Sequence, residues 1–287
     1  MLNFPRLISE VSSNHLGDLN RCKEFIKISK DVGCWAVKFQ LFKIDNLFAP
    51  EILSKSEKHR ARVAWELPTT FLPELANFTH DLGMKFSCTP FDLQAVADLQ
   101  PFVDFYKIAS YEMIWDDLII ECAKTKKDLV MSTGMATLEE IEHAQAVFKR
   151  HSDAKLTLLH AVSGYPTPYK EANLAAIKTL KDKFSCDVGL SDHSRSQAVV
   201  LRAIQKWNAS VVELHLDIDS KGAEFSSGHC WLPAEIKQLV SILKQGLEAD
   251  GTGEKKPMPS EMHDRQWRAD PSDGLRPLKH IRKNFNG

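Results

Sequence analysis

The sequence predicts one large (β/α)8 barrel. Short runs rich in β-branched and aromatic residues alternate with longer segments of helical period, a rhythm typical of a parallel sheet with helices outside it. There are eight such runs in 287 residues, and a barrel of eight strands commonly needs about 250 residues. Most of the runs also end in polar residues, and the active site of a parallel barrel lies at those carboxyl ends.

The expected strands are short and apolar. In chain order they are residues 6–11, 35–40, 85–90, 102–110, 128–134, 156–163, 187–192 and 210–217. The best-marked helices have recognisable ends. Residues 20–32 carry apolar side chains on one side and meet Gly33, a residue that commonly ends helices. Thr137 and Glu140 form a capping-box pattern, and Pro233 is a good first-turn residue for the last long helix.

Two regions do not fit the repeat. Residues 41–70 form a long polar connection, which is either functional or a solvated excursion. Residues 251–287 are rich in Pro, Gly, Arg and His and are too short for a second domain. We therefore expect a catalytic barrel over residues 1–250 and a tail over 251–287 that packs on the barrel or on a neighbouring subunit.

The composition excludes several classes of protein. With a formal net charge of -1 and a pI near 6.8, the chain shows no excess of positive charge that would attract nucleic acid or a membrane surface. The first residues, MLNFPRLISEV, show no signal peptide or membrane span, so we expect a cytoplasmic protein. The six cysteines form no CxxC pair, and we expect reduced thiols that pack as small hydrophobes.

Two lysines, Lys38 and Lys107, lie near the ends of apolar strands, where an unpaired ammonium would be costly to bury. Together with serine hydroxyls from other strand ends they predict a site for a phosphate or a carboxylate. The alternative is a purely structural network in which the lysines pair with Glu10 and Glu112.

His193 and His215 end the last two strands, which are neighbours in a closed barrel. Two such imidazoles predict a site for one divalent cation. Asp192 has the opposite parity along its strand, so we expect it to support the site rather than to bind the ion. No lysine follows the sixth strand to form a Schiff base, and no glycine-rich phosphate loop is present.

The motifs SEVSSNHLGDL, AVKFQ, SCTPFDLQAVADL, FYKIASYE, VMSTGMATLEEIEHA, LLHAVSGYPTPY, VGLSDHS and VVELH occur in this order. Over about residues 5–217 the chain therefore resembles the N-acetylneuraminate (sialic acid) synthase family. The resemblance implies a C–C bond-forming transferase that condenses phosphoenolpyruvate with an amino sugar such as N-acetylmannosamine. Phosphate is released by C–O cleavage after water adds to the former enol carbon. A divalent metal, Mn²⁺ or Mg²⁺, is implied as the cofactor.

The resemblance also assigns roles to residues. It implies that phosphoenolpyruvate is held by Lys38, Lys107, Ser110, Ser132, Ser163 and Ser191. His193 and His215 would bind the metal, and Glu10 would act as a proton shuttle or stabilise the tetrahedral intermediate. The remaining pocket residues would be Gln40, Thr89, Phe91, Glu112 and Tyr165.

Three features depart from the family pattern. Ser163 stands where many relatives have asparagine or glutamate. The loop KGAEFSSGHCWLP replaces the usual acidic loop after the eighth strand, so we expect Glu224 near the substrate, with Glu224 or His229 in place of the acidic residue. The chain shows no C-terminal antifreeze-like domain, which in relatives lends an arginine to a partner's site. We expect a homodimer, in which tail arginines such as Arg265, Arg268 and Arg276 could replace that arginine.

Two other functions remain open at the level of sequence. One is a related phosphoenolpyruvate synthase that makes another 2-keto-3-deoxy sugar acid, from a different sugar that is free or phosphorylated. Such an enzyme would need a second phosphate site, which residues 41–70 could supply. The other is a barrel that binds a ligand without catalysis, an interpretation favoured by the altered loop and opposed by retention of the strand-end residues.

Overall fold

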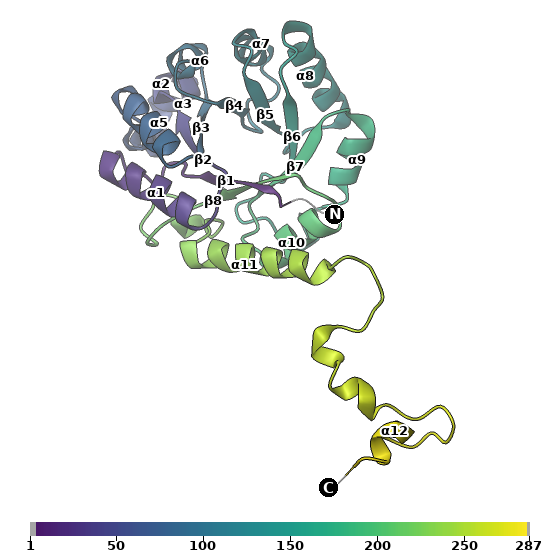
Figure 1. Ribbon diagram of the computed structural model, residues 1–287. Helices are drawn as coiled ribbons and strands as arrows, with labels where there is room; N and C mark the ends of the chain where they lie inside the picture. Colours follow the sequence, from purple (N-terminus) through teal and green to yellow (C-terminus); the bar gives the residue numbers. More distant parts are fainter. Residues whose placement is uncertain (1–3, 286–287) are drawn as a thin grey trace. The chain divides into compact units, whose positions relative to one another are not determined.

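The computed structural model describes residues 4–285. Up to Lys244 the chain forms one compact unit, a closed barrel of eight parallel strands in the order β1 to β8 (Figure 1). The strands are β1 (Arg6–Glu10), β2 (Ala36–Leu41), β3 (Lys85–Pro90), β4 (Phe105–Ile108), β5 (Asp128–Ser132), β6 (Leu156–Ala161), β7 (Asp187–Asp192) and β8 (Val211–His215). The predicted fold class is confirmed.

Helices follow the strands and surround the barrel (Figure 1). They are α1 (Leu19–Asp31), α5 (Leu72–Asp81), α6 (Leu93–Leu99), α7 (Asp116–Lys124), α8 (Leu138–His151), α9 (Ala176–Lys183), α10 (Gln197–Gln205) and α11 (Pro233–Asp250). Short 3-10 turns at Tyr169–Glu171 and Phe225–Ser227 lie in the loops after β6 and β8.

Local sequence sets several of these helix ends. The Asp18 side chain accepts hydrogen bonds from the backbone N–H groups at the start of α1, and Gly33 follows that helix with a φ of 89°. At α8 the predicted capping box is present in full, because Thr137 accepts from the Glu140 N–H and the Glu140 carboxylate accepts from the Thr137 N–H.

The inside of the barrel changes from apolar to polar along the strands. A lower layer is formed by Ile8, Ala36, Phe105, Val130, Leu159 and Val211, all buried and packed together. Because side chains alternate along a strand, the residues two positions later point into the same interior. Those positions are Glu10, Lys38, Lys107, Ser132, Ala161 and Glu213. Gly189 belongs to this crowded interior, since a Cβ there would lie 2.1 Å from the Val211 carbonyl oxygen.

The main hydrophobic core contains the strand positions of opposite parity, such as Leu7, Phe39 and Tyr106, together with the buried faces of the helices. All six cysteines are free, and every one except Cys186 is buried. The expectation of thiols that pack as small hydrophobes therefore agrees with their positions.

The segment between β2 and α5 is built from short helical pieces. These are α2 (Ile44–Leu47), α3 (Pro50–Lys55), α4 (Glu57–Arg60) and 3-10 turns at Ala61–Trp65 and Thr69–Phe71. The Glu66 carboxylate accepts hydrogen bonds from the Ile44 N–H and from the Lys43 ammonium, each at 2.8 Å. The long connection is therefore folded back on itself and ordered.

The second compact unit runs from Gln245. It contains the end of α11, 3-10 turns at Pro259–Glu261 and Asp264–Trp267, and α12 (Lys279–Arg282). Its last turn is held locally, because Asp270 accepts from the Ser272 hydroxyl and from the Lys279 N–H. Within residues 4–285 no helix is long and apolar enough to cross a membrane.

Candidate active site

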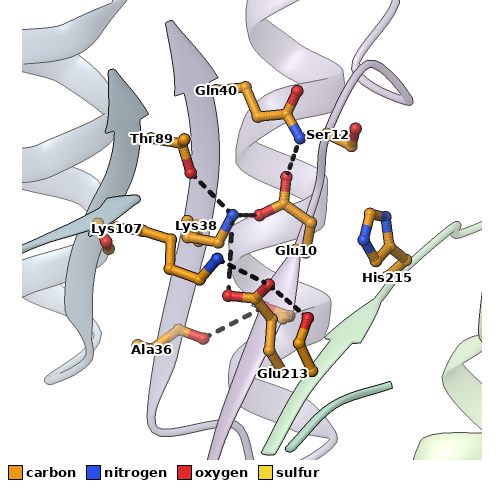
Figure 2. Close-up of polar contacts among 12 residues, drawn as sticks. Glu10, Ser12, Ala36, Lys38, Gln40, Thr89, Lys107, Glu213 and His215 are labelled. Atoms are coloured by element: carbon orange, nitrogen blue, oxygen red, sulfur yellow. Dashed lines mark hydrogen bonds and ion pairs between the residues drawn. The ribbon is translucent and has the colours of Figure 1, made fainter. Parts of the chain in front are cut away.

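The polar interior layer forms the floor of a site at the carboxyl ends of the strands (Figure 2). The Lys38 ammonium forms an ion pair with Glu10 and donates a hydrogen bond to Thr89 Oγ1 at 3.1 Å. The Gln40 amide donates to the other Glu10 oxygen at 2.9 Å. Burial lowers the pKa of Lys38 to about 8. The structure thus brings together four residues that the sequence placed at the site.

Glu213 on β8 lies between the two buried lysines. Its Oε2 is 3.8 Å from Lys38 Nζ and its Oε1 is 3.7 Å from Lys107 Nζ. The Ser191 hydroxyl donates to Oε1 at 3.1 Å. Although burial opposes ionisation, the ammonium groups of Lys107 and Lys38 hold the pKa of Glu213 below its ordinary value. Strand parity with His215 places Glu213 among the polar strand-end residues, but the family resemblance gave it no role.

The network resembles, in part, the structural alternative raised from sequence. Lys38 does pair with Glu10, but the ion-pair partner of Lys107 is Glu213 rather than Glu112. Glu112 is near enough for the Lys107 charge to lower its pKa, yet burial dominates and raises that pKa to about 7. One Glu112 oxygen is buried without a hydrogen-bond partner in the described chain.

A cluster of hydroxyl groups lies around Gly134, after β5. The Gly134 N–H donates to Ser110 Oγ at 3.0 Å. A Cβ at Gly134 would lie 2.5 Å from Ser163 Oγ and 2.8 Å from Ser110 Oγ. Ser132 and Ser163 have buried hydroxyls that find no partner within the described residues. A bound anion would accept hydrogen bonds from these unpaired hydroxyls, and Gly134 has no side chain to stand in its way.

Three side chains form a group suited to a cation. Single ligand atoms of His215, Glu224 and His229 all lie within 4.8 Å of one another. Glu224 Oε2 is buried and has no hydrogen-bond partner within the described chain. A neutral imidazole and a carboxylate are ordinary metal ligands, so these residues fit a divalent ion. Glu224, expected near the substrate, is thus beside His215.

Two residues that sequence reasoning missed hold this group in place. Asn14 accepts from the Glu224 N–H at 2.8 Å and donates to the Leu216 carbonyl at 2.9 Å. The Ser12 hydroxyl donates to Glu224 Oε1 at 2.5 Å. Both residues follow β1, so a loop more than 200 residues away in sequence positions the loop after β8. No local pattern in the sequence signals such a contact.

His193 lies next to this group but outside it. Its ring centroid is 5.2 Å from that of His215, and its Nδ1 is 2.7 Å from the Val162 carbonyl oxygen. Donation from Nδ1 leaves Nε2 available as a ligand. Burial lowers the pKa of His193 to about 3, which keeps the imidazole neutral. Metal binding by His193 stays a prediction.

The remaining expected residues are more scattered. The Tyr165 ring is 4.3 Å from that of His193 and 4.9 Å from that of His229, so it lies beside the imidazoles. Phe91 packs edge-on against Phe42, with 5.7 Å between the ring centroids, and its place in the substrate pocket stays a prediction. Asp192 points away from the site, since it accepts from Ser194 and from the Trp231 indole N–H. This arrangement agrees with a supporting role for Asp192.

The chain forms a closed (β/α)8 barrel, and buried lysines, carboxylates and imidazoles lie at the carboxyl ends of its strands. This arrangement is typical of (β/α)8-barrel enzymes, whose active sites lie at those ends. The sequence matches the NeuB family over residues 25–255, and the chain belongs to that family. This is the family of sialic acid synthases that the motifs indicated.

Named relatives agree with this membership. The chain is 35% identical over 268 residues to the N,N'-diacetyllegionaminic acid synthase of Campylobacter jejuni, a match that covers 89% of this chain and 80% of that protein. It is 29% identical over 278 residues to the pseudaminic acid synthase of Helicobacter pylori, with 93% and 82% covered. The crystal structure of the N-acetylneuraminic acid (sialic acid) synthetase from Leptospira borgpetersenii superposes with a TM-score of 0.79 at 29% identity, covering 91% of this chain and 90% of that one.

Proposed function

We propose that this protein is a nonulosonic acid synthase, a transferase that condenses phosphoenolpyruvate with an amino sugar aldehyde and releases phosphate. Two observations carry the proposal: a pair of buried lysines at the strand ends, and the buried hydroxyls of Ser132 and Ser163, which have no hydrogen-bond partner among the described residues. Such groups suit a small, highly charged anion. Family membership and the synthase relatives support the same reaction.

The anion-binding residues come from three sides of the barrel. Lys38 and Lys107 supply fixed positive charge, the hydroxyls of Ser110 and Ser163 lie next to Gly134, and Ser132 adds a buried hydroxyl at the end of β5. Ser191 differs from the expectation, because its hydroxyl donates to Glu213 rather than pointing freely into the site. We assign Ser191 and Glu213 together the role of orienting the lysines toward phosphoenolpyruvate.

Glu10 is proposed to handle protons during the reaction. The new C–C bond forms between C3 of phosphoenolpyruvate and the sugar aldehyde carbon, after which water adds to C2 and the C–O bond to phosphate breaks. Glu10 contacts both Lys38 and Gln40, and a carboxylate beside the proposed anion-binding lysine would be able to take a proton from the incoming water. Glu112, Thr89, Phe91 and Tyr165 are proposed to line the sugar-binding side.

His193, His215 and Glu224 are proposed to hold a divalent metal ion, for which Mn²⁺ and Mg²⁺ are the ions that the sequence resemblance implies. The bound ion would polarise the sugar aldehyde toward attack. Ser12, which donates to Glu224, and the Val162 carbonyl, which accepts from His193, would orient these ligands.

A phosphorylated sugar is the second candidate acceptor. Among the described residues 41–70, Lys43 is engaged with Glu66, and Arg60 donates to the Leu53 carbonyl. Lys55, Lys58 and Arg62 lie in the same segment, so the choice between the two acceptors rests on the assay below.

The test is phosphate release from phosphoenolpyruvate in the presence of Mn²⁺, measured with a panel of free and phosphorylated hexoses and hexosamines. We expect release with an N-acylated hexosamine such as N-acetylmannosamine and little with phosphorylated sugars. The Lys107→Met variant serves as the matched inactive control. If the protein is folded and metal-loaded and none of the sugars in the panel supports phosphate release, the synthase function is contradicted and a binding protein is favoured.

Such an enzyme is expected in the cytoplasm, where phosphoenolpyruvate is made, and as a homodimer. Light scattering on the purified chain should then give twice its mass of 32.4 kDa. The tail from residue 251, with its arginines, is proposed to pack on the barrel or on the partner subunit. Charge reversal at Arg268 would change dimer content or sugar KM if that placement is right.

A further inference from the structure

Three loops of the barrel mouth meet at Gly134. A Cβ at this residue would lie 2.5 Å from Ser163 Oγ, in the loop after β6, and 2.8 Å from Ser110 Oγ, in the loop after β4. The Gly134 N–H also donates a hydrogen bond to Ser110 Oγ at 3.0 Å. The loops after β4, β5 and β6 are therefore held against one another at the proposed anion site.

Each of these loops continues into a large apolar side chain. Tyr111 directly follows Ser110, Met135 directly follows Gly134, and Tyr165 comes two residues after Ser163. All three are exposed, and the exposed fraction is 62% for both Tyr111 and Met135. Because their loops are joined at Gly134, these side chains emerge around one point at the edge of the mouth.

Exposed apolar residues are concentrated at this end of the barrel. Six of them lie on the loops after β4, β5 and β6, namely Tyr111, Ile114, Trp115, Met135, Tyr165 and Tyr169. Among the described residues of the barrel, only Phe4 is a large exposed apolar residue at the amino ends of the strands. Scattered apolar residues on a surface need no explanation, whereas a group gathered at one mouth indicates a binding surface.

The backbone of Met135 is strained. Its φ is 66°, in the left-handed region that a residue with a side chain rarely adopts. Glycine would take this conformation without cost, and the residue before Met135 is a glycine. Residues held in such conformations cluster at active sites and ligand clamps. The strain therefore favours a functional use of the exposed Met135 side chain.

The same group of side chains adjoins the imidazoles. The Tyr165 ring centroid lies 4.3 Å from that of His193 and 6.2 Å from that of His215. Burial raises the pKa of Tyr165, and the neighbouring phenol of Tyr111 adds to that rise. Tyr111 and Tyr165 thus occupy the same part of the mouth. The apolar surface borders both the hydroxyl cluster and the imidazoles, where the proposed function requires the acceptor sugar.

The chemistry of an amino sugar shows what such a surface can recognise. Its hydroxyl groups are polar, and the alkyl part of an N-acyl group is its most apolar substituent. An aromatic ring offers this group a large apolar face, and the flexible thioether of methionine adapts to ligands of different size.

We propose that Tyr111 and Met135 form an acyl-binding surface, which contacts the alkyl chain of the acceptor's N-acyl group and accepts chains longer than acetyl. This proposal rests on the proposed function, which makes an amino sugar the acceptor. Tyr111 and Met135 would then determine specificity, whereas the chemistry stays with the residues at the strand ends.

The test measures sugar binding apart from catalysis. The full chain is titrated by calorimetry, with Mn²⁺ present, with open-chain N-acyl mannosamines whose aldehyde has been reduced to an alcohol, so that they cannot react. The acyl group is acetyl, propanoyl or butanoyl, and the unacylated compound is the reference. We expect the affinity to rise about 4-fold with each added methylene group, the gain typical of burying one such group.

Variants then locate the surface. Tyr111→Ala and Met135→Gly should each reduce the gain to less than about 2-fold per methylene group and leave binding of the unacylated compound nearly unchanged. Tyr111→Phe keeps the ring and should keep the gain. Met135→Gly suits a backbone at this φ, so it should fold at least as well as wild type. Val63→Ala is the matched control, since it shortens an exposed apolar side chain between β2 and α5.

The acyl-binding surface is ruled out if wild type binds no sugar, if its affinity does not change with chain length, or if folded Tyr111→Ala and Met135→Gly proteins keep the full gain. Phosphate release from phosphoenolpyruvate is assayed separately with the corresponding aldehydes. Binding that depends on chain length without phosphate release would refute the synthase alone. Phosphate release with equal kcat/KM for every chain length would refute the acyl-binding surface alone.

Discussion

Glu213 faces Lys38 inside the barrel, with 3.8 Å between Oε2 and Nζ. Lys107 lies on its other side, and all three side chains are almost fully buried. Burying one ammonium is costly, and burying two is tolerable only where carboxylates compensate them. Glu213 therefore allows the barrel to bury two ammonium groups at the ends of its strands.

Neutralising Glu213 should destabilise the fold. We expect Glu213→Gln to lower the free energy of unfolding by about 3–5 kcal/mol, because both lysines lose a buried partner. Urea unfolding at pH 7 measures this value. Ser191→Ala is the matched control: it removes only the hydrogen bond to Glu213 and should cost about 1 kcal/mol. Equal unfolding midpoints for Glu213→Gln and wild type would refute the role given to this carboxylate.

Phosphoenolpyruvate binding should weaken at high pH. Burial lowers the pKa of Lys38 to about 8, and only the ammonium form attracts the anion. Affinity should therefore be constant below about pH 7 and fall as pH rises through about 8. Calorimetric titration from pH 6.5 to 9.5 checks this. Lys38→Met should bind about 10- to 100-fold more weakly at pH 7. If the variant shows the same pH profile as wild type, Lys38 is not the titrating group.

Glu112 should make the protein less stable as the pH rises, whereas a carboxylate in an ion pair usually makes a protein more stable as the pH rises. Burial raises its folded pKa from 4.5 to about 7, so the fold favours the protonated form. The contribution of Glu112 to the free energy of unfolding is complete below about pH 4.5 and is lost as the pH rises through about 7. The change amounts to about 3 kcal/mol. Glu112→Gln cannot ionise and should become more stable than wild type between pH 5 and pH 8. Urea unfolding across this range measures the difference, with exposed Glu142→Gln as control. Parallel curves for wild type and Glu112→Gln would be inconsistent with a raised pKa.

Adding a methyl group at Gly134 should damage the anion site but not the fold. The new Cβ would collide with the hydroxyls of Ser163 and Ser110, which can rotate away but would no longer face the anion. We expect Gly134→Ala to raise the KM for phosphoenolpyruvate at least about 10-fold, the equivalent of about 1.4 kcal/mol, with little change in melting temperature. Gly164→Ala is the matched control, since its nearest neighbours are 3.8 Å away. A similar KM for both variants would argue against the cluster as an anion site.

Local and periodic features of the sequence determined much of the structure. Eight apolar runs became eight strands because each is buried on both faces, and the capping box at Thr137 formed because its bonds are local. Strand alternation also predicted that Glu10, Lys38 and Lys107 share the interior, since a barrel brings all carboxyl ends to one mouth. The same rule, applied to VVELH, places Glu213 with His215 at the end of the eighth strand.

The sequence by itself determined the barrel, its polar mouth and the family, because period, parity and ordered motifs are properties of short segments. Only the tertiary structure decided which charges pair and which ligands meet. Glu213 rather than Glu112 pairs with Lys107, and His229 joins His215 because Asn14 and Ser12 hold the loop after β8 in place. The contacts of Asn14 and Ser12 join residues more than 200 positions apart, and no spacing along the chain encodes them.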